Sequence, residues 1–166
     1  MALKSDRLYG TTTIKHFMNE VAEAGGIATL STAGSGAATD QSRHLVTYSA
    51  TNSGKIPVGL LICDMVNKDL TRTHLNQCKY EVQKGGKVEL ARDGFWLTNF
   101  IVPGQTITGG QPAYVGPSGK LSNVNDAGSF MVGQWESTKD EDGYAEINLQ
   151  IPGPRPVAGP AGVAQA

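Results

Sequence analysis

Three histidines, His16, His44 and His74, are the side chains of this sequence that suit acid–base or metal chemistry near neutral pH. None of them has a carboxylate or a cysteine at the spacing of a catalytic or metal-binding motif. The two cysteines, Cys63 and Cys78, form neither a CxxC redox motif nor a zinc ligand pair. We therefore predict no catalytic residue, no metal site and no cofactor, and we expect that the chain is not an enzyme.

The stretch GPSGK, residues 116–120, partly matches two motifs, the nucleophile elbow of hydrolases and the phosphate-binding P-loop, but satisfies neither. Lys120 stands where the nucleophile elbow has its second glycine, and the P-loop's upstream glycine and following Ser or Thr are absent. The surrounding segment, 109–123, is rich in glycine and proline, as turns are. We interpret it as a hairpin with a strand over 113–115 and a turn at 117–119.

An acidic run, Asp140 to Asp142 followed by Gly143, matches part of a calcium-binding loop. If Asp140 and Asp142 are taken as positions 3 and 5 of that loop, the twelfth position, which should be a bidentate Glu, falls on Leu149. We predict a solvated hairpin tip there.

The composition bounds the remaining classes of function. The chain has 166 residues and a formal net charge of −1, so no overall field favours nucleic acid or an anionic membrane. It contains neither a membrane-length apolar run nor the apolar segment of a signal peptide, and we expect synthesis in the cytoplasm. Its 21 glycines and 8 prolines with 17 % charged residues predict short strands joined by many turns.

One helix is predicted, in the stretch TTTIKHFMNEVAEAGG at residues 11–26. Ile14, Phe17 and Val21 recur at helical spacing, and two glycines follow. Its narrow apolar face must lie against its own β-domain or against another subunit. We assign residues 1–26 to an N-terminal helical arm.

Strand patterns follow from residue 43 onward. They predict a mainly β fold, a small antiparallel barrel or sandwich, over 27–151. Arg92-Asp93-Gly94 predicts a hairpin between two alternating runs. Residues 152–166 are Pro, Gly or Ala at eleven of fifteen positions, which indicates an extended tail.

Three stretches resemble a known family: VGLLICDMVNKDLTRTHLNQCKYEVQKGGKVELARDGFWLTNFI, then GQTITGGQPAYVGPSGKLSN, then SFMVGQW. They are similar to the capsid decoration, or cement, proteins of tailed bacteriophages. The resemblance spans roughly residues 57–151 and rests on turn motifs. Gln111 departs from it, because an Asp is more usual there.

The resemblance implies a non-enzymatic structural protein of the virion, which binds the outer surface of an assembled capsid and stabilises it by bridging neighbouring subunits. The implied partners are the major capsid protein and further copies of this chain, as a homo-dimer or homo-trimer, without nucleic acid or membrane. The alternative is a head-exposed module that binds a receptor or a glycan. For that alternative the sequence offers Trp135 and the residues 123–126.

Six residues are candidates for the interface, because aromatic side chains and Met are enriched where protein surfaces meet. Two of them are adjacent on a predicted strand and should point to opposite faces, so at least one should leave the main core. The six are Phe17, Met18, Val21, Phe95, Trp96 and Tyr114.

Overall fold

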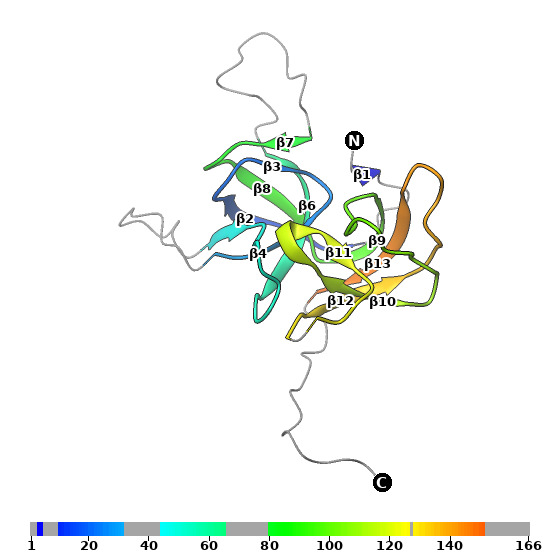
Figure 1. Cartoon of the computed structure of the whole chain (residues 1–166). Coiled ribbons are helices and arrows are strands. Elements are labelled where there is room, and N and C mark those ends of the chain that lie inside the picture. The colour runs from blue at the N-terminus through cyan, green and yellow to red at the C-terminus, as the bar shows by residue number, and fades with distance from the viewer. Residues whose placement is uncertain (1–2, 5–9, 32–43, 66–79, 127, 152–166) are drawn as a thin grey trace, which may run out of the picture.

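The computed structural model describes residues 3–4, 10–31, 44–65, 80–126 and 128–151, which form two packed β-bodies (Figure 1). The fold is mainly β, which confirms the predicted class. A short 3-10 turn, η2 (Pro117–Gly119), lies between two strands of the second body. The predicted tail, 152–166, lies outside the described residues.

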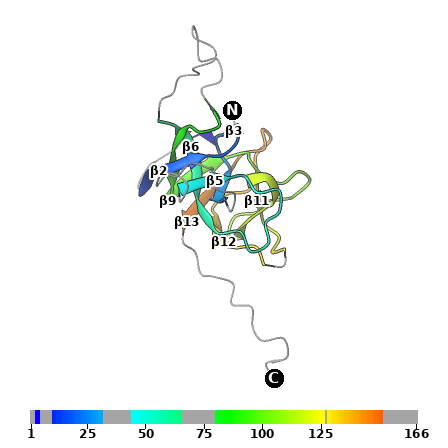
Figure 2. The ribbon, with the colours of Figure 1, turned by 90° about the vertical axis from the view of Figure 1, so that its left-hand side faces the viewer.

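The first body is a closed five-stranded barrel in the order β2-β5-β4-β6-β8. All neighbouring pairs are antiparallel except β2 with β5, which run parallel. Figure 2 looks onto this side of the molecule. The strands are β2 (Thr12–Met18), β4 (Ile27–Leu30), β5 (Leu45–Thr47), β6 (Pro57–Asp64) and β8 (Lys87–Ala91).

The second body is a six-stranded antiparallel sheet in the order β1-β9-β13-β12-β10-β11. A bridge between Ile101 and Leu121 brings the chain after β9 beside β11, so the sheet curls toward closure. A separate pair, β3 (Ala22–Glu23) and β7 (Glu81–Val82), lies by the barrel. The sheet strands are β1 (Leu3–Lys4), β9 (Asp93–Thr98), β10 (Pro112–Val115), β11 (Leu121–Ser122), β12 (Met131–Trp135) and β13 (Ala145–Gln150).

One wall of the barrel is shared by two hydrophobic cores. On β6, Leu61 points into the barrel core with Leu90, whereas its neighbour Leu60 joins Trp96 in the core under the six-stranded sheet. All four side chains are at most 1 % exposed. Because β6 is covered on both faces, its sequence PVGLLICD reads as a continuous apolar run rather than an alternation.

The predicted N-terminal helix is wrong. Residues 12–18 form β2, which pairs with β8 and β5 inside the barrel. Two residues of the supposed helical stripe, Ile14 and Val21, are 46 % and 56 % exposed, so that stripe is not a buried face. The run of threonines with Ile14 and Phe17 instead favours an extended backbone, because β-branched and aromatic side chains suit strands. The segment 12–26 is therefore part of the folded body and not a separate arm.

The predicted hairpin at Arg92-Asp93-Gly94 is also wrong. Asp93 and Gly94 lie inside β9, and Gly94 faces Leu149 of β13. The chain passes at Arg92 from the barrel into the six-stranded sheet, where the Arg92 N–H donates to the Thr11 carbonyl. Asp-Gly favours a hairpin because glycine readily adopts a positive φ. Here Gly94 has a φ of 101°, but it lies within a strand and not in a turn.

The hairpin prediction for 109–123 is confirmed. β10 and β11 pair antiparallel, with Val115 opposite Leu121, and η2 forms the turn between them. The turn contains left-handed backbone at Ser118 and Gly119, with φ values of 54° and 73°. The Ser118 N–H donates to the Ser49 carbonyl at 2.7 Å, so the hairpin tip reaches back to the chain after β5.

Tyr48 joins the barrel to the six-stranded sheet. Its hydroxyl donates to the Glu23 carbonyl at 2.7 Å and accepts from the Gly26 N–H at 3.1 Å. Its ring meets the ring of Phe100, with centroids 5.5 Å apart. In a second link, the Thr98 hydroxyl of β9 donates to the Gly25 carbonyl at 3.0 Å. The two bodies therefore meet through buried polar as well as apolar contacts.

Candidate functional site

The structure separates the six predicted interface residues into two groups. Met18 and Trp96 are at most 1 % exposed and belong to the two cores, so neither side chain can contact a partner. Phe17 is half-buried on β2. Phe95 is 38 % exposed, which confirms that one of the adjacent pair leaves the core.

Phe95 and Tyr114 lie on one surface, although they are nineteen positions apart in the sequence. Phe95 pairs with Asn148, Asn148 with Gln134, and Gln134 with Pro112, so this row crosses four adjacent strands. Tyr114 follows Pro112 by two positions on β10 and points to the same side. We call these five outward-pointing residues the outer face.

The outer face consists of uncharged side chains. Its apolar groups come from Phe95, Pro112 and Tyr114, and two amides lie between them. The amides are held in place, because Gln134 donates to the Gly110 carbonyl at 3.1 Å and Asn148 donates to the Glu136 carboxylate at 3.3 Å. Such a surface can pack against an apolar patch and still offer directed hydrogen bonds.

The opposite side of the same strands is the core that fixes them. Trp96, Ile147, Trp135 and Ala113 alternate with the outer-face residues and are at most 1 % exposed. Burial of large side chains at this density restricts their rotamers. The outer face is therefore presented by a rigid sheet rather than by loops.

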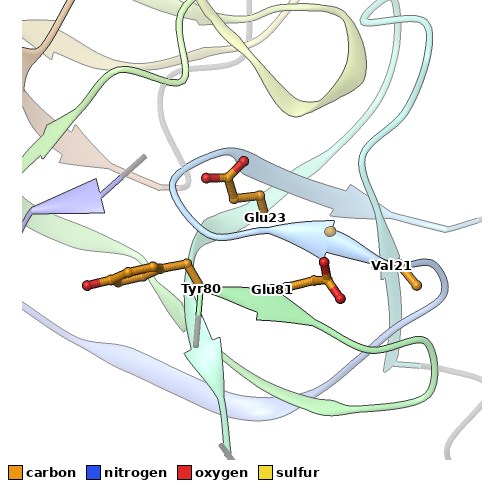
Figure 3. A pocket seen from close by; sticks show the side chains of 5 residues that line it. Val21, Glu23, Tyr80 and Glu81 are labelled. Atoms are coloured by element: carbon orange, nitrogen blue, oxygen red, sulfur yellow. The ribbon is translucent and has the colours of Figure 1, made fainter. Parts of the chain in front are cut away.

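The sixth candidate, Val21, lines a small cavity of about 260 Å³ by the two-stranded sheet (Figure 3). Ala22, Glu23, Tyr80 and Glu81 complete its lining. Glu23 and Glu81 are directly paired across β3 and β7, where like charges oppose each other. Gln83 donates to the Glu81 carboxylate at 2.8 Å and offsets part of that repulsion. Chemically, the cavity suits a cationic or weakly polar group.

Sequence reasoning missed a contact between two of the three histidines. His16 of β2 and His44, just before β5, meet edge to face with ring centroids 5.7 Å apart. The parallel pairing of Phe17 with Leu45 places them side by side. No motif spacing could reveal this contact, because it depends on strand register; His74 lies outside the described residues.

The residues that would favour glycan binding are engaged elsewhere. Trp135 is fully buried, so its ring cannot stack on a sugar. The Asn123 amide donates to the Thr106 carbonyl and to the Gln111 side chain, at 2.9 Å and 3.1 Å. This amide ties two loops together.

The acidic run forms a hairpin tip between β12 and β13, as predicted. The Asp140 carboxylate accepts the Tyr144 N–H at 2.6 Å, and Asp140, Glu141 and Asp142 are all exposed. Across the described ranges, no three His, Cys, Asp or Glu side chains gather as a metal site requires. No helix in the described part of the chain is long and apolar enough to cross a membrane.

No protein-family model matches the chain, and no curated protein matches it significantly.

Proposed function

We propose that this chain is a non-enzymatic structural protein that binds the outside of an assembled viral capsid and stabilises it by bridging neighbouring capsid subunits. The outer face of the six-stranded sheet is the contact surface in this proposal. The observation that carries it is the alignment of Phe95 and Tyr114, two residues suited to an interface, along one row of uncharged side chains. The resemblance of residues 57–151 to capsid decoration proteins supports the same function.

The chemistry of the outer face suits a flat protein partner. Aromatic side chains bury a large area at low conformational cost, and amide side chains can both donate and accept hydrogen bonds. A rigid sheet loses little entropy on binding, so more of the contact free energy appears as affinity. Many copies on one shell then multiply contacts that are individually weak.

Stabilisation of the shell follows from mass action. A protein that binds the assembled capsid and not its separated subunits lowers the free energy of the assembled form. The capsid should therefore gain resistance to heat and to chelation. Homo-dimers or homo-trimers of the chain would place several outer faces on adjacent subunits, because closed oligomers repeat the same surface.

The direct test is sedimentation of the purified protein with empty expanded heads that lack it. We expect saturation at a fixed copy number that matches a lattice site, and a higher melting temperature of the heads. Phe95→Ser with Tyr114→Ser should weaken binding by about tenfold or more, since truncating an interface anchor costs above about 1 kcal/mol.

A matched control is Ile56→Ser, which removes an exposed apolar side chain, 44 % exposed, at the barrel instead of the outer face. It should leave head binding unchanged. Equal losses for the two changes would refute the outer face as the contact surface. Failure of the unaltered protein to bind heads, with binding to host receptors or glycans instead, would favour the alternative function.

A further inference from the structure

His16 occupies a buried position without a hydrogen-bond partner for one ring nitrogen. Its side chain is 4 % exposed, and no described residue bonds its buried Nδ1. Two positions further along β2 lies the buried Met18, and the residue opposite His16 on β8 is the uncharged Val88. A neutral imidazole can occupy such a place, whereas an imidazolium there would lack an acceptor.

The position lies at one of the two shortest strand pairings of the barrel within the described residues, β2–β5, which like β4–β5 has two register pairs. β2 meets β5 through only two register pairs, Phe17 with Leu45 and Met18 with Val46. The Asn19 N–H adds a bond to the Val46 carbonyl at 2.9 Å. On its other side β2 pairs with β8 at four positions. Loss of a few interactions at the β2–β5 seam would therefore separate these strands while β2 stays attached to β8.

The charged and titratable side chains that act on His16 are all basic residues, which are positively charged when protonated. Lys15 comes from its own strand, His44 from the chain entering β5, and Arg92 from the end of β8. His44 is in ring contact with His16 across the seam. A proton on His16 would be repelled from all three sides.

We propose that proton uptake by His16 separates β2 from β5 and so opens the barrel at mildly acidic pH. Opening lets water reach the imidazole ring and increases its distance from His44, which removes the two costs of protonation. The strand edges of β2 and β5 would then be free to pair with another chain.

The direction of the pH dependence follows from linkage. Burial, and then the neighbouring Lys15, His44 and Arg92, lower the pKa of His16 from 6.5 to about 4. The open form, with an ordinary pKa, therefore binds more protons, so the closed barrel is favoured above pH 6.5 and loses stability as the pH falls toward 4. Those two pKa values correspond to an increase of about twentyfold in the opening equilibrium constant between pH 7 and pH 5.

The test is hydrogen exchange of the isolated protein at pH 7 and pH 5, corrected for the intrinsic pH dependence of exchange. We expect the Asn19 amide to lose about twentyfold in protection. The Glu136 amide, bonded to the Glu146 carbonyl in the six-stranded sheet, should keep its protection. The measurement uses no capsid, so its result is independent of head binding.

His16→Gln should remove most of this pH dependence, and His74→Gln, at the third histidine, should preserve it. If His16→Gln does not fold, NMR titration of His16 in the unaltered protein decides the question. A His16 pKa near 6.5 in the closed barrel, or equal loss of protection at Asn19 and Glu136, would overturn the proposal.

Discussion

The ring of Tyr48 lies against the backbone of Gly119, so closely that a Cβ on that glycine would come within 2.5 Å of two ring carbons. Tyr48 follows the barrel strand β5, and Gly119 lies in the hairpin turn of the six-stranded sheet. The contact holds the two bodies together at a point where no larger residue than glycine fits.

Gly119→Ala should destabilise the protein for two reasons, the ring contact and the backbone φ of 73°. Gly143→Ala isolates the second reason, because Gly143 has a φ of 85° but no atom within 4 Å of the added Cβ. We expect about 1–2 kcal/mol for Gly143→Ala and at least about 1 kcal/mol more for Gly119→Ala, measured by urea unfolding. Equal losses would show that the ring yields without cost.

Tyr48→Phe should reduce the unfolding free energy by about 1–3 kcal/mol, because it leaves the buried Gly26 N–H without its acceptor. Tyr114→Phe is the control, since it removes a hydroxyl from the half-exposed outer face and should change stability by less than about 0.5 kcal/mol. Urea unfolding of the two variants side by side gives the difference. Similar small losses would mean that water replaces the Tyr48 hydroxyl.

Glu20 anchors the chain that leaves β5. Its Oε1 accepts both the Thr47 hydroxyl and the Tyr48 N–H, each at 2.5 Å. Glu20→Ala should lower the unfolding free energy by about 1–3 kcal/mol. Glu20→Gln keeps an oxygen at the same position and should lose less than Glu20→Ala. If both variants lose the same amount, the negative charge rather than the oxygen is the stabilising group.

Cys63 should react slowly with thiol reagents in the folded protein. Burial, followed by the neighbouring Glu89 and Asp64, raises the pKa of its thiol from 9.0 to about 11. At pH 8 this corresponds to about a hundredfold less thiolate than an ordinary cysteine has. Alkylation rates of the Cys78→Ser variant, folded and in urea, measure the effect. Glu89→Gln should speed the folded reaction, and an unchanged rate would assign the protection to burial alone.

Much of the second body could be predicted from the sequence. Hairpin turns with several glycines and a proline, at 109–123, and an acidic tip at 140–143 locate their strands correctly, because turn chemistry is local. In the first body, the continuous apolar run beginning at Pro57 likewise marks β6. These signals require only residues that are neighbours in the chain.

The first body was harder to predict for a physical reason. The apolar spacing in 12–18 fits a helix and a strand equally, and pairing with β8 decides between them. The outer face and the contact of His16 with His44 depend on register between distant strands. A single sequence does not show which distant strands pair with one another, so Phe95 and Tyr114 could be proposed individually but not as one surface.

The position of β13 in the six-stranded sheet has a consequence for biosynthesis. This strand is the last described element in the chain, yet it lies between β9 and β12. The ribosome therefore completes every strand of the barrel before the strand that joins the two halves of the sheet has emerged. Until then, Ile27, Leu60 and Ala91 on the shared wall have no β13 to help cover them. A nascent chain stalled before residue 145 should thus be a target for chaperones.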